Sequence, residues 1–256
     1  MRMLTIEDES FGGVPALHIY DMNEGRTPLP TMLYWHGFSS AKEHNLDFAY
    51  QLAKKGIRVV LPEARHHGER REGLTEKQRL FKFWSIVIEG LQDTQSIRDS
   101  LEEQQLIKDS RLFTAGTSMG GILTCGALAA FPWIKGGAVM MGNPAWESYA
   151  RQQIKILKEQ GTFPISDEKA EQEIQQLLHY DLSQQPALLG DRPLFFWHGR
   201  EDNVVPYEDS YAFYEKIKQT RLIGDDTIMY HLEEKAMHKV SREGMLAMAD
   251  WTVKHI

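Results

Sequence analysis

Six short apolar runs, separated by stretches with helical spacing, constrain the fold more than any other feature of this sequence. They lie at residues 31–35, 57–61, 111–115, 137–141, 194–197 and 227–232. Short apolar runs that end at glycine or proline are typical of strands buried on both faces of a sheet. Strands that alternate with helices favour a parallel sheet with right-handed crossovers. The sequence therefore predicts an α/β fold with a mostly parallel central sheet and helices on both faces.

Five stretches between or after these runs carry the apolar spacing of helices. They lie at residues 46–53, 86–106, 118–131, 207–218 and 241–255. The stretch 118–131 is small and apolar, so we expect a buried helix there, with Cys125 in the core. Two runs at 4–6 and 16–20 are joined across a Gly-Gly pair. They predict an antiparallel hairpin at one edge of the sheet.

About fifty residues separate the fourth and fifth apolar runs, which is more than one crossover helix needs. They include two amphipathic stretches, 149–160 and 167–180, which are rich in Gln, Glu and Lys. Such an insertion either decorates the surface or covers a site at the strand ends, where open α/β sheets bind ligands. We expect a helical cap at about 144–190, inserted into a single domain that spans residues 1–256.

Charge balance and cysteine content exclude several classes of protein. Lys and Arg total 29 and Asp and Glu total 36, so the formal net charge is −7. Nucleic-acid binders normally carry a basic face, so we expect no nucleic-acid partner. One cysteine, Cys125, permits neither an internal disulfide nor a cysteine-based zinc cluster. Acids interrupt the N-terminal stretch and no apolar run approaches the ~20 residues of a membrane span, so we expect a soluble, cytoplasmic protein without a membrane partner.

The sequence Gly-Thr-Ser-Met-Gly at residues 116–120 carries the strongest chemical signal. An apolar strand runs directly into it, and a helix of small residues runs directly out of it. In this context the motif places the serine on a strained strand-to-helix turn, with its hydroxyl at a helix N-terminus. A serine that only caps the helix would not require both glycines. We therefore predict that Ser118 is a nucleophile.

A serine nucleophile needs a base and an orienting carboxylate, which on such a fold follow in the order Ser, Asp or Glu, His. Asp202 lies in a polar loop after the fifth apolar run, with Glu201 as its nearest rival. His238 lies in a loop after the last run, whereas His231 falls inside that run and His255 stands at the chain end. The order predicts Asp202 as the acid and His238 as the base.

A tetrahedral intermediate also needs an oxyanion hole. One donor is the backbone N–H after the nucleophile, which belongs to Met119, and the other comes from the loop after the third strand. In that loop Gly37 allows the backbone to approach closely, so we predict the N–H of Phe38 as the second donor. We interpret His36 as a structural histidine that braces this loop by hydrogen bonds.

The segment 63–71 carries two adjacent histidines among several charged residues. Its spacing places no third metal ligand, so we interpret it as a loop held by ion pairs near the site entrance. The chain has no phosphate-binding or dinucleotide-binding fingerprint. These residues therefore give no signal for a metal or a nucleotide cofactor.

These features resemble the α/β-hydrolase superfamily from about Thr31 to the end of the chain. The resemblance is carried by the motifs at residues 36–38, 116–120 and 198–206 and by His238. The segment 61–71 is similar to a Pro-Asp-x-x-x-His-Gly-x-Arg loop of small bacterial serine esterases in the prolyl-oligopeptidase and dienelactone-hydrolase-like branch. The match extends to Bacillus esterases of about this length.

The resemblance implies an α/β-hydrolase fold and hydrolysis of carboxylic esters through an acyl-enzyme, without metal or cofactor. This chain departs from its relatives in two ways. The nucleophile is Ser118 and not the cysteine of true dienelactone hydrolases, which argues against that substrate. No propeller precedes the domain, so we do not expect a size-gated oligopeptidase.

The sequence thus predicts a serine carboxylesterase that acts on a small-molecule ester with a small acyl group. An aminopeptidase or amidase would use the same triad, but no motif places an acidic pair to hold a peptide amino terminus. A hydrolase fold that only binds a ligand is a third interpretation, since fold does not imply function. The ordered Ser118, Asp202 and His238 favour an enzyme. The sequence leaves the oligomeric state open.

Overall fold

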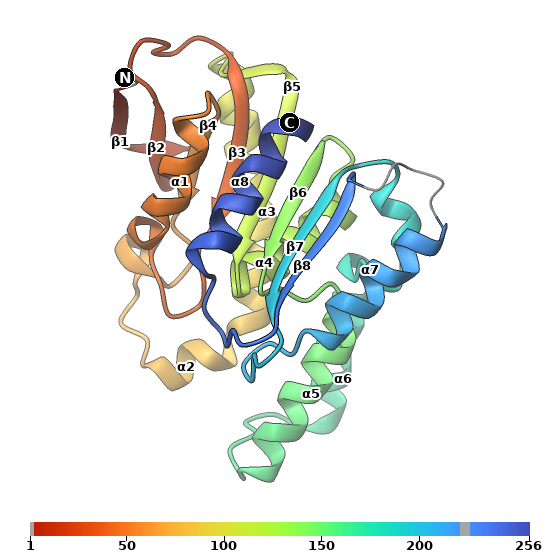
Figure 1. Ribbon diagram of the computed structural model, residues 1–256. Coiled ribbons are helices and arrows are strands. Elements are labelled where there is room, and N and C mark those ends of the chain that lie inside the picture. Colours follow the sequence, from red (N-terminus) through yellow and green to blue (C-terminus); the bar gives the residue numbers. More distant parts are fainter. Residues whose placement is uncertain (1–2, 221–225) are drawn as a thin grey trace.

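The predicted apolar runs form strands of one sheet. The computed structural model describes residues 3–220 and 226–256, and in it eight strands pair in the order β1-β2-β4-β3-β5-β6-β7-β8 (Figure 1). Their bounds are β1 Leu4–Phe11, β2 Val14–Asp21, β3 Leu29–Trp35, β4 Arg58–Pro62, β5 Ile107–Thr117, β6 Gly136–Met140, β7 Leu194–Gly199 and β8 Ile228–Glu233. The β1–β2 and β2–β4 pairs are antiparallel, and all other pairs are parallel. The mostly parallel sheet and its edge hairpin are confirmed.

Helices cover both faces of the sheet (Figure 1). On one face lie α1 (Leu46–Ala53) and α8 (Arg242–His255), and on the other lie α3 (Phe83–Glu103), α4 (Met119–Ala130) and α7 (Glu208–Thr220). Alternate residues of β3 enter the two cores. Leu33 and Trp35 pack in the core under α3 and α4, while Met32 and Tyr34 pack under α1 and α8. This double burial explains why the strand reads as a continuous apolar run.

The segment between β6 and β7 contains the two predicted helices. They are α5 (Trp146–Glu159) and α6 (Asp167–Leu177), which pack against each other and project beyond the sheet (Figure 1). Two short 3-10 turns follow, at Leu178–Tyr180 and Pro186–Leu189. Ser166 caps α6, because its hydroxyl accepts the N–H of Lys169 at 3.3 Å.

The structure adds elements that the sequence pattern did not predict. A short helix, α2 (Glu76–Phe81), begins with a capping box in which Thr75 and Gln78 exchange hydrogen bonds. α3 begins at Phe83, which is buried in the core, and ends at Glu103, so each end lies three residues before its predicted position. Among the described helices, none has the length and apolar character to cross a bilayer.

Candidate active site

Ser118 lies on a sharp turn between β5 and α4. Its backbone has φ 57° and ψ −114°, a conformation that costs a non-glycine residue free energy. Two hydrogen bonds hold the turn: the Ser118 N–H donates to the Met140 carbonyl at 2.8 Å, and the Ile122 N–H donates to the Ser118 carbonyl at 2.9 Å. The strain is thus maintained by the sheet on one side and the helix on the other.

The two glycines of the motif have a steric reason. A Cβ at Gly116 would overlap the backbone of Gly120, and a Cβ at Gly120 would overlap the carbonyl of Trp35. α4 therefore packs against β3 and β5 at backbone contact distance. This close packing places the first turn of α4 directly behind the Ser118 hydroxyl.

The structure brings the three predicted side chains together. His238 Nε2 lies 2.9 Å from Ser118 Oγ, and His238 Nδ1 lies 2.6 Å from Asp202 Oδ2. The residues follow β5, β7 and β8, so the carboxyl ends of parallel strands deliver all three to one edge of the sheet. The rival Glu201 is exposed, and the His255 ring contacts the Trp251 carbonyl.

Asp202 is buried and held by several donors. Its Oδ1 accepts the N–H groups of Val204 and Val205 at 2.9 and 3.0 Å, and His198 Nε2 lies 3.4 Å from Oδ2. Burial alone would raise the pKa of the Asp202 carboxyl. The hydrogen bonds from His198, His238 and Val205 outweigh burial and hold that pKa well below its usual range. The carboxylate is therefore charged where it faces the imidazole.

This pKa shift also links Asp202 to stability. A carboxyl whose pKa falls on folding stabilises the native state above its unfolded pKa of about 3.9. That contribution disappears as the pH falls through the lower folded value.

The loop after β3 is braced by His36, as the sequence predicts. His36 Nδ1 donates to the Gly37 carbonyl at 2.8 Å, and the Ala64 N–H donates to His36 Nε2 at 3.0 Å. The Gly37 carbonyl and the Phe38 N–H belong to one planar peptide unit. His36 therefore fixes the orientation of the peptide that carries the predicted oxyanion donor.

Comparison with known proteins places the chain in a family. The model of the prolyl oligopeptidase family matches residues 49–256. The chain belongs to this family. It is 42% identical over 250 residues to "Putative esterase YitV" of Bacillus subtilis (strain 168), covering 97% of this chain and 98% of that protein. It is also 30% identical over 260 residues to Esterase YjfP of Escherichia coli (strain K12), covering 99% and 100% of the two chains.

Solved structures share the fold. The crystal structure of TT1662 from Thermus thermophilus superposes with a TM-score of 0.77 at 18% identity, covering 97% of this chain and 96% of that one. The strand order and these relatives establish the α/β-hydrolase fold. The protein is thus a hydrolase of the prolyl oligopeptidase family.

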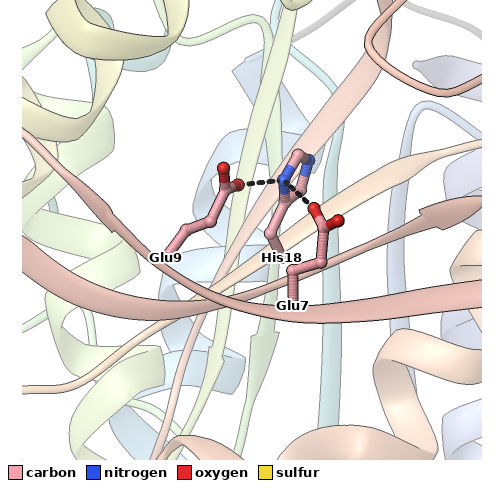
Figure 2. A group of neighbouring side chains, drawn as sticks. All are labelled: Glu7, Glu9 and His18. Atoms are coloured by element: carbon pink, nitrogen blue, oxygen red, sulfur yellow. Dashed lines mark hydrogen bonds and ion pairs between the residues drawn. The ribbon is translucent and has the colours of Figure 1, made fainter.

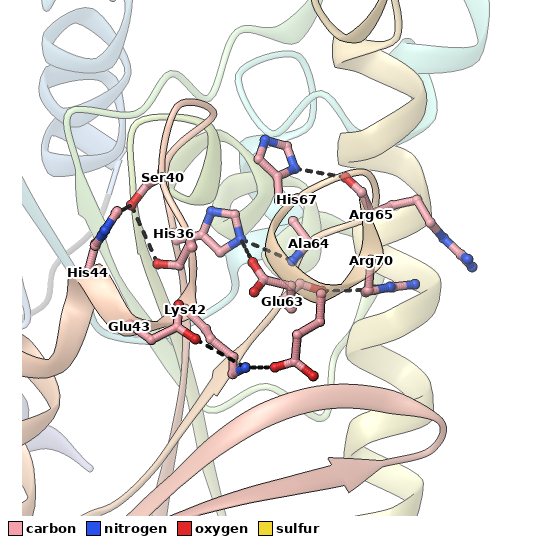
Figure 3. A network of polar contacts seen from close by, with 12 residues as sticks. His36, Ser40, Lys42, Glu43, His44, Glu63, Ala64, Arg65, His67 and Arg70 are labelled. Atoms are coloured by element: carbon pink, nitrogen blue, oxygen red, sulfur yellow. Dashed lines mark hydrogen bonds and ion pairs between the residues drawn. The ribbon is translucent and has the colours of Figure 1, made fainter. Parts of the chain in front are cut away.

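Glu63 lies behind the loop after β3, and the sequence analysis did not single it out. Its side chain is completely buried, and Oε1 lies 3.0 Å from His36 Nε2 (Figure 3). A Cβ at Gly68 would overlap the Glu63 carboxylate, and the φ of 42° at Gly68 is a conformation that favours glycine. A glutamate that directly follows a buried strand was the available signal, but such a position is usually a solvated loop. Only the tertiary contact reveals its link to His36.

The predicted ion-paired segment supports the same loop. His67 Nε2 lies 2.5 Å from the Phe38 carbonyl oxygen, and Arg70 pairs with Asp93 at 2.5 Å. Burial, followed by the nearby His36, lowers the pKa of His67 to about 4. Residues 63–71 therefore pack behind the loop that contains Phe38.

Two clusters among the described residues have metal-ligand chemistry. In the first, oxygens of Glu43, Glu63 and Glu69 lie within 4.8 Å of one another. The buried Lys42 ammonium lies 3.2 Å from Glu43 (Figure 3), and it also contacts Glu69. The chain's own ammonium thus already pairs with two of the three carboxylates.

The second cluster joins Glu7, Glu9 and His18 on the β1–β2 hairpin (Figure 2). His18 Nε2 accepts a hydrogen bond from Arg58, so Nδ1 carries the proton and donates to Glu9. Burial, followed by the charge of Arg58, lowers the pKa of His18 to about 4. The arrangement fits a buried polar network that ties the hairpin to β4 better than it fits a metal site.

Ser118 and His238 open onto a cavity of about 580 Å³. Phe38, Tyr149 and Val204 also line it, so the loop after β3, α5 and the loop that contains Asp202 contribute to its walls. A cavity of this size is within the range that holds small molecules. The side chains that carry chemistry therefore face a space that a substrate can enter.

Proposed function

We propose that the protein is a serine carboxylesterase that cleaves a small-molecule ester through an acyl-enzyme on Ser118. The observation that carries the proposal is the His238 imidazole, which lies between the Ser118 hydroxyl and the Asp202 carboxylate at 2.9 and 2.6 Å. Esterase names on relatives that match nearly the whole chain support the same chemistry.

The proposed acylation starts when Ser118 Oγ attacks the ester carbonyl carbon and His238 Nε2 takes the serine proton. Asp202 keeps Nδ1 protonated and stabilises the imidazolium. The backbone N–H groups of Phe38 and Met119 stabilise the oxyanion. His238 then gives its proton to the alcohol oxygen as the C–O bond breaks.

Deacylation repeats these steps with water. His238 takes a proton from water, whose oxygen attacks the acyl carbon. The proton then returns to Ser118 Oγ as the ester bond to the enzyme breaks. The products are a carboxylic acid and the free enzyme. His238 accepts and returns the proton in both half-reactions.

We further propose that residues 144–190 form a lid on a single domain. Tyr149 and Gln153 of α5 line the cavity around Ser118, which supports a role for this insertion in substrate access.

The function can be tested with matched substrates. We expect hydrolysis of p-nitrophenyl acetate and butyrate, slower cleavage of the corresponding p-nitroanilides, and labelling of Ser118 by a fluorophosphonate probe. Peptide mass spectrometry would locate the label. A folded protein that neither takes up the probe nor cleaves the esters would contradict the proposal, and faster anilide cleavage would favour an amidase.

Glu63 provides a test of the oxyanion loop. In Glu63→Gln the new amide N–H can donate to His36 Nε2 in place of the Ala64 N–H, so the ring that holds the Gly37–Phe38 peptide shifts. We expect kcat to fall by about tenfold, less than the 10²–10³-fold cost of removing an oxyanion donor itself, with KM nearly unchanged. Steady-state kinetics would measure both constants.

The matched control is Glu69→Gln on the same loop. Glu69 is exposed and contacts Lys42 instead of His36. We expect its kcat to stay near wild type. Equal kcat values in Glu63→Gln and wild type would show that the Glu63–His36 contact does not act on the oxyanion loop.

A further inference from the structure

We infer that a second, apolar compartment beside Ser118 binds the aliphatic chain of the ester, so that the substrates carry medium-length alkyl chains. The inference rests on the proposed esterase function and specifies its substrate class. It starts from a cavity of about 570 Å³ that does not include Ser118.

This compartment lies between the cap and the main body of the protein. α5 and α6 form one wall, and α2 with the start of α3 forms the other. Its apolar lining includes Phe83, Trp84, Ile154, Leu157, Phe163 and Ile174. The charged lining residues Lys82, Lys169 and Glu173 are exposed, so charge is confined to the rim. An apolar interior with a polar rim suits an alkyl chain better than a sugar or a peptide.

The compartment shares a wall with the cavity that contains Ser118. Five residues line both spaces: Leu80, Phe83, Tyr149, Gln153 and Val204. They come from α2, α3, α5 and the Asp202 loop. A chain attached to an acyl group or alcohol at Ser118 therefore meets this wall first.

The wall is tied to the catalytic residues. The Tyr149 hydroxyl donates to the Val204 carbonyl at 3.2 Å, and the Val204 N–H donates to the Asp202 carboxylate. The rings of Phe83 and Tyr149 meet edge to face, with centroids 6.5 Å apart. The boundary between the two spaces thus contains two aromatic rings and is hydrogen-bonded to Asp202 through Val204.

Exposed apolar side chains in the compartment also indicate that it binds an apolar ligand. Leu80, Ile156 and Val204 line the compartment and are 43%, 45% and 54% exposed. An alkyl chain that covers such surface gains affinity with each methylene, by up to about fourfold. The five lining residues shared with the Ser118 cavity favour the substrate's own chain as the occupant over a second copy of the protein.

Two substrate series test the inference on the wild-type protein. One is p-nitrophenyl esters from acetate to dodecanoate, and the other is alkyl acetates from methyl to decyl, followed by acid release. We expect kcat/KM to rise at least about tenfold between two and eight carbons in one series. The rising series shows whether the chain belongs to the acyl or the alcohol side. Ester hydrolysis with flat or falling profiles in both series would overturn the inference, whereas no Ser118-dependent ester hydrolysis would reject the proposed function.

Substitutions on α5 locate the compartment. Leu157→Trp fills it, so we expect the ratio of kcat/KM for the preferred eight-carbon ester to kcat/KM for the acetate ester to fall at least about tenfold. Ala150 lies about two helical turns before Leu157, next to Tyr149 of the shared wall. Ala150→Phe should therefore leave room only for a shorter alkyl chain than Leu157→Trp does. Gln152→Trp, on an exposed position of the same helix, should leave both the kcat/KM ratio and the preferred chain length as in wild type.

The variants also distinguish an alkyl chain from a second copy of the protein as the occupant of the compartment. An unchanged chain-length profile in folded Leu157→Trp, or loss of a dimer with no kinetic change, would overturn the inference in favour of an interface. Where both filled variants fail to fold, inhibition of the wild type decides. We expect decanoate to inhibit acetate-ester hydrolysis at least about tenfold more strongly than acetate does, and equal inhibition by the two acids would contradict the inference.

Discussion

Ser118→Ala should lower kcat for p-nitrophenyl butyrate on the order of 10⁶-fold, because no other group replaces the attacking oxygen. Binding and the oxyanion donors would remain and would leave a small residual rate. The strained backbone at residue 118 is held by bonds to Met140 and Ile122 that do not involve the side chain. We therefore expect the variant to fold and to melt near the wild-type temperature.

Ser39→Ala is the matched control for this experiment. Ser39 is an exposed serine that lines the same cavity as Ser118. Its replacement should leave kcat within about twofold of the wild-type value and should leave fluorophosphonate labelling intact. Initial rates on purified, folded proteins decide the outcome. If Ser118→Ala retained more than a few per cent of wild-type turnover, another group would have to be the nucleophile.

Asp202→Asn should lower kcat by about 10⁴-fold, although the side chain keeps its shape. The Asn carbonyl oxygen can still accept the N–H groups of Val204 and Val205, so the loop should persist. Its amide, however, donates to His238 Nδ1 and moves the imidazole proton to Nε2. The nitrogen that faces Ser118 then cannot accept a proton.

The pKa of Asp202 sets how this loss depends on pH. Its hydrogen bonds hold the pKa below the usual carboxyl range, so the wild-type residue is charged at neutral pH and well below it. The rate gap between wild type and Asp202→Asn should therefore be fully present across neutral pH. Glu201→Gln, at the exposed neighbouring acid, is the control and should remain near wild type. A loss of less than about tenfold in Asp202→Asn would assign the orienting role to another residue.

The sequence determined the local features of this protein. Apolar runs predicted the strands because residues buried on both faces of a parallel sheet must all be apolar, as Met32 and Leu33 show. Gly116 and Gly120 predicted the turn at Ser118 because no other residue permits its packing. These signals involve residues close together in the chain, so they can be recognised from one sequence alone.

Contacts between distant segments were decided by the tertiary structure. Ser118 and His238 are 120 positions apart, and only the sheet brings them to 2.9 Å. Glu63 carries no pattern that distinguishes it from a solvated loop residue until His36 is seen beside it. The apolar compartment likewise exists only where α5 and α6 meet α2 and α3, since its walls come from segments far apart in the sequence whose meeting no local pattern predicts. Local spacing encodes local conformation, whereas a site's shape depends on how the finished elements pack.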